Sequence, residues 1–220
     1  MPAEYARNSD ANPLDALLGR YAAGALDPAL YALVQAHLEL KPDNRRFVQA
    51  LEGLEGERLL EMPLTDVETR DACLARIFGE ELAQKPRAPS SASSQLPASI
   101  RRYVGRDLDA IAWRSLLPGV RECKVNAADG IEASLFWIGA GRAIPSHTHE
   151  GSETTLVLQG AFSDLNGNYG RGDIVIADAE IDHRPTVDKG GDCLCFAVTE
   201  GHLHLTGPVG RIIDRFFGPR

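Results

Sequence analysis

The apolar residues of the first 84 positions recur every three or four residues, a period that is typical of amphipathic helices. The first pattern begins at Asn12-Pro13, a capping side chain followed by proline at the first helical position, and it ends near Gly24. Asp27-Pro28 repeats this start signal, and two further patterns cover residues 43–60 and 66–82. We expect the inner faces of these last two helices to carry Phe47, Leu51, Leu54, Val67, Leu74, Ile77 and Phe78. The pattern therefore predicts a small bundle of four helices.

From residue 100 onward the pattern changes to short apolar and β-branched runs separated by Gly, Asn or Asp, which are typical of strands. Examples are residues 131–138, 153–160 and 192–198. Many short strands at this spacing favour a sandwich or barrel.

A stretch rich in proline and serine, residues 85–99, separates the two patterns and has almost nothing to bury. This composition indicates a flexible linker that lets the flanking domains move relative to each other. We therefore predict a mainly β chain with an α-helical N-terminal domain at 1–84, a linker at 85–99 and a β domain at 100–220.

Composition narrows the classes of function. The hydrophobic content of 44% and charged content of 25% are ordinary for a globular protein of 220 residues. No apolar run approaches the roughly 20 residues of a membrane span, and the N-terminus lacks the apolar core of a signal peptide, so we expect a cytoplasmic protein. The 23 basic and 31 acidic residues give a net charge of −8, which argues against direct nucleic-acid binding. Any role in gene expression would therefore act through another protein.

The candidate chemistry lies in the segment around His147 and His149. These histidines are two residues apart, so on an extended chain both rings point to the same face. Glu153 follows a Gly-Ser turn that can bring its carboxylate to the same side. Imidazole and carboxylate together suit zinc, iron, manganese, nickel or copper. The competing interpretation is a chance pair of surface histidines.

This segment resembles a known family motif. The spacing of Gly141, His147, His149, Glu153 and Gly160 is similar to the first cupin motif at every fixed position. That resemblance weighs against a chance pair and implies a small barrel of the jelly-roll, or double-stranded β-helix, type.

The second cupin motif is expected about one hairpin later. Gly172 opens a strand, and His183 follows eleven residues on, which is the spacing of that motif. Asp178 and Glu180 stand where the motif usually has proline and glycine, so the departure affects a turn and no ligand. The resemblance implies that one divalent metal ion is held by His147, His149, Glu153 and His183.

The helical part has a resemblance of its own. Residues 23–30, the helix reaching His37 and the proline and arginine that follow are similar to the N-terminal domain of zinc anti-sigma factors of the ChrR-like family. In that family a histidine and a CxxC pair help hold zinc, and the aligned positions here are His37, Lys41 and Asn44. Because both thiolates are missing, we expect this domain to fold without metal and His37 to lie on a helix face.

Two functions follow from these resemblances. The first is a ChrR-like transcriptional regulator that binds an alternative sigma factor, with a metal-binding cupin domain that senses a stress signal or small molecule. The missing thiolates leave open whether the helices still bind a sigma factor or have become another protein contact, such as a homodimer interface. The ChrR-like resemblance favours zinc, although the donor set also suits iron, manganese or nickel.

The second function is a metal-dependent enzyme of the cupin dioxygenase or isomerase type, with a helical domain for assembly. Three histidines and one glutamate would leave two positions open on an octahedral ion.

Two further pairs could take part. Cys193 and Cys195 share one face of an apolar strand, so they either pack in the core or form a redox-responsive pair near the metal. His202 and His204 alternate with leucines and are interpreted as surface or lumen-edge residues.

Overall fold

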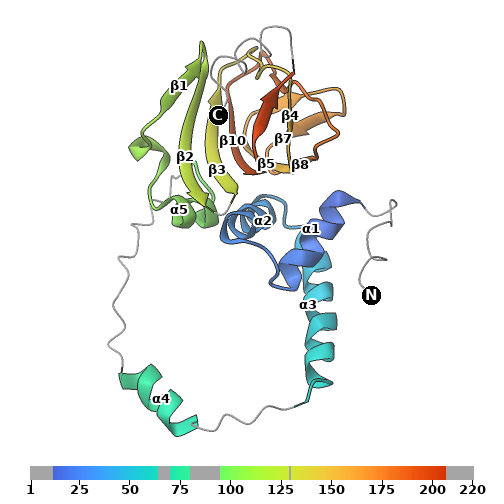
Figure 1. Ribbon diagram of the computed structural model, residues 1–220, viewed down its shortest axis with the longest axis vertical. Helices are drawn as coiled ribbons and strands as arrows, with labels where there is room; N and C mark the ends of the chain where they lie inside the picture. The colour runs from blue at the N-terminus through green and yellow to red at the C-terminus, as the bar shows by residue number, and fades with distance from the viewer. Residues whose placement is uncertain (1–11, 64–69, 80–94, 129, 207–220) are drawn as a thin grey trace.

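The computed structural model describes residues 12–63, 70–79, 95–128 and 130–206. The chain forms helices at its N-terminal end and three antiparallel sheets after them (Figure 1). The helices are α1 Pro13–Ala22, α2 Pro28–Leu40, α3 Asn44–Leu60, α4 Arg70–Gly79 and α5 Ala98–Val104, followed by the short 3₁₀ helix η1 Leu108–Ala110. None of the described helices has both the length and the apolar character needed to cross a membrane.

The largest sheet has six strands in the order β1-β2-β3-β10-β5-β8. Their bounds are β1 Arg114–Leu117, β2 Val120–Ala128, β3 Ile131–Ile138, β10 Cys193–Glu200, β5 Glu153–Gln159 and β8 Ile174–Ala177. The smaller sheets pair β4 with β11, and β6 with β7 and β9. Those strands are β4 His147–His149, β11 Leu203–Leu205, β6 Ala161–Ser163, β7 Asn168–Gly170 and β9 Thr186–Val187. The prediction of a mainly β chain with an α-helical N-terminal part is confirmed.

Both predicted helix starts are present. The Asn12 side chain accepts a hydrogen bond from the backbone N–H of Leu14 at 3.1 Å. Asp27 accepts from the N–H groups of Ala29 and Leu30 at 2.8 and 3.1 Å. Proline occupies the first helical position in each case, where its missing N–H costs nothing.

Helix α2 packs against the sheet, and the helices and barrel share one hydrophobic core (Figure 1). Leu33 and Val34 of α2 are fully buried in the same cluster as Leu156 of β5 and Phe196 of β10. The ring of Tyr103 in α5 meets that of Phe196 edge-on, with the centroids 5.9 Å apart. Helix α2 is therefore covered on several sides, which explains why apolar residues occupy a wide part of its surface.

A polar junction reinforces this packing at the end of α2. His37 Nδ1 lies 2.7 Å from the carbonyl oxygen of Gly172, and its Nε2 lies 2.8 Å from Nδ2 of Asn44 in α3. Lys41 pairs with Asp173 at 3.1 Å. Gly172 has φ +89°, and a Cβ there would lie 2.9 Å from Lys41 Cγ, so only glycine permits this close approach. His37, expected on a helix face, is thus buried where α2, α3 and the barrel meet.

Of the predicted linker, the structure describes residues 95–99. Leu96 is buried, and Ala98 begins α5. The Glu39 carboxylate of α2 accepts hydrogen bonds from the backbone N–H groups of Ala98 and Ser99 at 2.8 and 3.0 Å. These contacts hold the start of α5 against α2, while the division into two domains at this stretch stays a prediction.

The expected inner faces of α3 and α4 are wrong. Val48 is the buried residue of α3, whereas Phe47 and Leu54 are 41% and 58% exposed. In α4 the described side chains include none that is buried, and Phe78 is 83% exposed. Val67 lies outside the described residues. The sequence pattern reveals an apolar face, but α1 covers only part of α3, and α4 stands apart from the other helices (Figure 1).

Candidate metal centre

Strand pairing brings the four predicted ligands together. His147 and His149 occupy the two ends of β4, and Glu153 begins β5 after the intervening turn. His183 lies in the segment before β9, where its backbone N–H and carbonyl exchange two hydrogen bonds of 3.1 Å with those of His147. This isolated bridge fixes the second motif against the first.

The ligand atoms converge on one point inside the barrel. One ligand atom from each of the four side chains lies within 4.8 Å of the other three. His149 Nε2 is 3.4 Å from His183 Nε2 and 3.6 Å from Glu153 Oε2. The three histidines are only 1–3% exposed. Three imidazole nitrogens and one carboxylate form a donor set that could hold a divalent metal ion.

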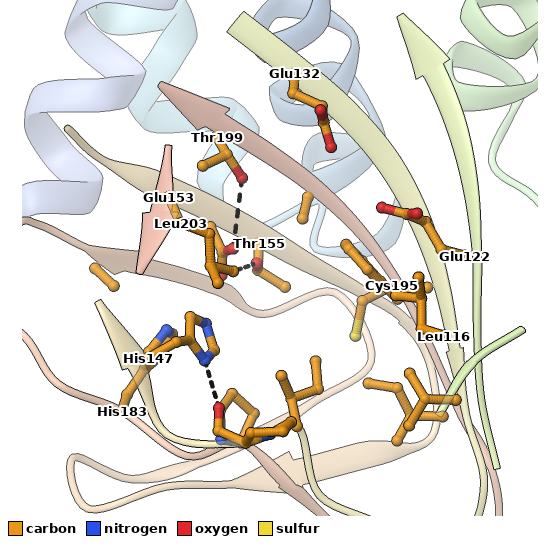
Figure 2. Close-up of a pocket in the computed structure, with 18 of the residues that line it drawn as sticks. Leu116, Glu122, Glu132, His147, Glu153, Thr155, His183, Cys195, Thr199 and Leu203 are labelled. Carbon is orange, nitrogen blue, oxygen red and sulfur yellow. Dashed lines mark hydrogen bonds between the residues drawn. The ribbon is translucent and has the colours of Figure 1, made fainter. Parts of the chain in front are cut away.

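Neighbouring groups orient two of the ligands (Figure 2). His147 Nδ1 lies 2.8 Å from the Pro145 carbonyl, which can only accept, so the proton is on Nδ1 and Nε2 is available. The Glu153 carboxylate accepts hydrogen bonds from the hydroxyls of Thr155 and Thr199 at 3.1 and 3.5 Å. A carboxylate held in this way is fixed before any ion arrives.

The electrostatics favour neutral imidazoles. Burial lowers the pKa of His149, and the nearby Glu153 carboxylate opposes this effect. Burial also lowers the pKa of His183, helped by the neighbouring His147. A neutral ring is the form that binds a metal ion.

The departure from the second cupin motif does not displace its histidine. The Asp178 side chain accepts a hydrogen bond from the backbone N–H of Glu180 at 3.0 Å, which closes the turn that proline and glycine would otherwise shape. The Thr148 hydroxyl, between the two β4 ligands, donates to the carbonyl of Ala179 in that turn at 2.9 Å.

A cavity of about 480 Å³ opens beside the four side chains (Figure 2). Its walls include His147, Glu153 and His183 at one side and mostly apolar residues elsewhere. This volume falls in the range of small-molecule sites, roughly 300–1,000 Å³. A bound molecule could therefore reach the metal centre.

Sequence reasoning missed two acidic residues near this site. Glu122 is 4% exposed, lines the cavity and pairs with Arg114 at 2.6 Å. The sequence signal that could have revealed Glu122 is its position two residues after the buried Val120, which places both side chains on the same face of one strand. Asp164, in the turn after β6, places Oδ2 3.9 Å from His183 Nδ1. No sequence signal foretells that contact.

The paired cysteines are buried free thiols whose sulfur atoms are 3.5 Å apart. The hydrogen bond with Cys193 and then burial raise the pKa of the Cys195 thiol, so its reactive thiolate is disfavoured. This environment fits the packing interpretation, although Cys195 also lines the cavity. His202 and His204 are exposed, and His204 contacts Glu150 at 3.1 Å.

The comparisons with known proteins agree with this architecture. Residues 102–204 match the family described as ChrR cupin-like domain. The chain is 38% identical over 205 residues to anti-sigma-E factor ChrR of Cereibacter sphaeroides, which covers 92% of this chain and 95% of that protein. It is also similar to a chain in the crystal structure of Rhodobacter sphaeroides SigE in complex with the anti-sigma ChrR. That match has 39% identity and a TM-score of 0.71, over 84% of this chain and 96% of the other. The N-terminal helices, the barrel and the sequence identity along almost the whole chain together show that the chain belongs to the ChrR family of anti-sigma factors.

Proposed function

We propose that this protein is an anti-sigma factor whose helical region binds an alternative sigma factor and whose metal-binding barrel senses the signal for release. The observation that carries the proposal is the identity of 38% along almost the whole of both chains to an anti-sigma-E factor. The related crystal structure, which contains SigE together with ChrR, supports a sigma factor as the class of partner.

The exposed faces of α3 and α4 support this choice of binding region. Large apolar side chains are exposed along both helices, namely Phe47, Leu54, Leu59, Leu60, Leu74, Ile77 and Phe78. Such a concentration is typical of a protein-binding surface. Phe47 and Leu54 are seven residues apart and so share one helix face, the spacing with which a helix enters a groove of a partner. A net charge of −8 also suits a partner that binds nucleic acid and is therefore basic.

The N-terminal helices keep their polar junction with the barrel although both thiolates are missing. Asn44 stands at one of the positions where the family has cysteine, and it bonds His37 across α2 and α3. Lys41, at the other position, pairs with Asp173 of the barrel. We propose that these contacts hold the helices together without metal, and that the scaffold keeps its sigma-binding surface.

We assign the metal to His147, His149, Glu153 and His183, with zinc as the first choice. Family membership favours zinc, while iron, manganese and nickel suit the same donors. A bound ion supplies a positive charge that joins β4, β5 and the segment before β9, and its binding should stabilise the barrel. The proposed units are a head at 1–84, a linker at 85–99 and a barrel at 100–220.

The sigma-binding proposal is tested by mixing the purified full-length chain with each alternative sigma factor of its host and separating complexes by size-exclusion chromatography. We expect one of them to co-elute, and Leu54→Glu on α3 to abolish the complex. Leu165→Glu provides a matched control, because Leu165 is a 93% exposed leucine on the barrel. Failure of every sigma factor to bind would refute this part of the proposal.

The cavity beside the metal favours a second candidate, a metal-dependent enzyme acting on a small molecule. Oxygen uptake by the metal-loaded chain with small diketones and thiols distinguishes the two. Oxygen uptake by the wild type that disappears in His147→Ala would favour the enzyme. No oxygen uptake by the wild type, together with sigma binding, would favour the regulator.

A further inference from the structure

The turn after β6 holds a carboxylate in an unusual place. Asp164 Oδ1 accepts hydrogen bonds from the backbone N–H groups of Asn166 and Gly167 at 2.8 and 3.1 Å, so the backbone fixes the orientation of the side chain. The other oxygen, Oδ2, faces Nδ1 of His183 at 3.9 Å. The Asp164 side chain is only 1% exposed. A turn residue is normally directed to solvent, and this one is directed into the barrel.

The two facing atoms lie close together but are not hydrogen-bonded to each other. Asp164 Oδ2 and His183 Nδ1 are buried, and neither makes a hydrogen bond among the residues that the structure describes. Leaving one buried polar group unsatisfied costs about 1–3 kcal/mol, so two that face each other favour a hydrogen bond between them. A shift of about 1 Å would bring them within hydrogen-bond distance. Asp164 also acts on Tyr169, whose pKa is raised first by burial and then by the charge of this carboxylate and a side-chain hydrogen bond to it.

Proton accounting shows when this hydrogen bond would form. A metal ion bound here through Nε2 of each histidine would leave a proton on each Nδ1. For His147 that proton goes to the Pro145 carbonyl. For His149, Nδ1 has no partner within the described part of the chain. For His183, Asp164 is the available acceptor.

We infer that Asp164 is the positioning residue of His183: its carboxylate accepts a hydrogen bond from Nδ1–H and thereby presents Nε2 to the metal. The inference rests on the proposed metal site. His183 needs this support more than its partners do, because it lies in a connecting segment, whereas His147 and His149 belong to a strand. A carboxylate behind a ligand histidine fixes the tautomer and makes the ring a better donor.

The test uses Asp164→Asn in the full-length protein. The amide oxygen of the asparagine can keep both backbone hydrogen bonds, but the NH₂ group then faces His183 Nδ1. This favours the tautomer with the proton on Nε2, which cannot bind a metal through Nε2. We expect zinc affinity, measured by competition with a chromogenic chelator, to fall about 10–100-fold. The thermal midpoint of the metal-free protein should change little by comparison, because the asparagine keeps both backbone hydrogen bonds of the turn.

Asn166→Ala is the matched control, because Asn166 is exposed in the same turn and bonds Asp164 through its backbone alone. It should bind zinc as the wild type does. A second readout needs no variant: nitrogen-15 NMR of the zinc-loaded wild type should show His183 protonated on Nδ1.

The outcomes are separable. Unchanged zinc affinity in Asp164→Asn would overturn the role of Asp164 and leave the metal site standing. A proton on Nε2 of His183 in the loaded wild type would overturn the role of Asp164 and would also remove His183 Nε2 from the ligand set. A wild-type chain that binds no zinc or other divalent metal would overturn the metal site, and the inference with it.

Discussion

Two clusters of this molecule place buried histidines among polar side chains, and they differ in one decisive respect. In the head, both ring nitrogens of His37 have partners, the Gly172 carbonyl and the Asn44 amide. In the barrel, the Nε2 atoms of His149 and His183 face each other at 3.4 Å beside the Glu153 carboxylate. The head cluster is complete without an ion. The barrel cluster gathers electron-pair donors around one point where a divalent cation could bind.

The difference shows what a histidine's surroundings reveal that its burial does not. Burial lowers the pKa of His37 as it does that of His149, so both rings are kept neutral. The two kinds of site differ at the second ring nitrogen of the histidine. When a neighbouring group hydrogen-bonds to this nitrogen, the histidine joins two elements of the fold. When the remaining ring nitrogens of several histidines converge, they form a candidate ligand set.

Metal removal should produce the largest effect and should involve the barrel cluster alone. Stripping the ion from the wild type with a chelator should lower the thermal midpoint, because an ion bound only by the folded state adds about 4 kcal/mol at 1,000 times its Kd. Differential scanning calorimetry with and without chelator measures the change. In His147→Ala the two scans should coincide. A chelator effect that persists in this variant would place the ion elsewhere.

His37→Ala should give the next largest effect, in the head. It removes both hydrogen bonds of the joint and leaves the buried Gly172 carbonyl and the half-buried Asn44 amide without this partner, which should lower the free energy of unfolding by about 2 kcal/mol. Urea denaturation of the metal-loaded protein measures the loss. Metal content should stay that of the wild type, and a fall in it would contradict the separation of the two clusters.

The pH dependence of the unfolding free energy should also report on His37. The folded state lowers the pKa of His37 from 6.5, chiefly by burial, with Asp173 opposing and Lys41 adding to the shift. The unfolded chain therefore binds the proton more readily, so this contribution is full above pH 6.5 and is lost as pH falls below it. We expect the difference in unfolding free energy between the wild type and His37→Ala to shrink by at most about 1.4 kcal/mol per pH unit. A difference that stays constant from pH 7.5 to 5 would count against a neutral His37.

Lys41→Ala should have the smallest effect. The ion pair with Asp173 joins side chains that are 45% and 39% exposed, and such pairs contribute about 0–1 kcal/mol. Asp173→Ala should cost more, since Asp173 also accepts a hydrogen bond from the Gly170 N–H at 2.8 Å. Urea denaturation compares the two variants. Equal losses would mean that the ion pair, and not the turn, is what Asp173 contributes.

Local spacing explains what the sequence could predict. His147, His149 and Glu153 belong to one strand, one turn and the start of the next strand, so their spacing along the chain predicts that their side chains converge. The helix starts at Asn12 and Asp27 are equally local, because each cap bonds a backbone group two or three residues away.

Long-range packing explains what it could not. His37 meets a carbonyl 135 residues further along the chain, and no pattern within α2 indicates that contact. Asp164 and Asn166 belong to the same turn, yet only the fold shows which of them faces His183. The apolar positions Phe47 and Leu54 were visible as a face of α3, but the pattern does not say whether this chain or another protein covers them.

The most direct test of the contrast is the number of metal ions per chain, counted by inductively coupled plasma mass spectrometry on the full-length protein. The account predicts one ion in the wild type, one in the double variant His37→Ala/Asn44→Ala, and none in His147→Ala/His149→Ala. An ion that survives the loss of the two barrel histidines, or disappears with the head pair, would contradict it.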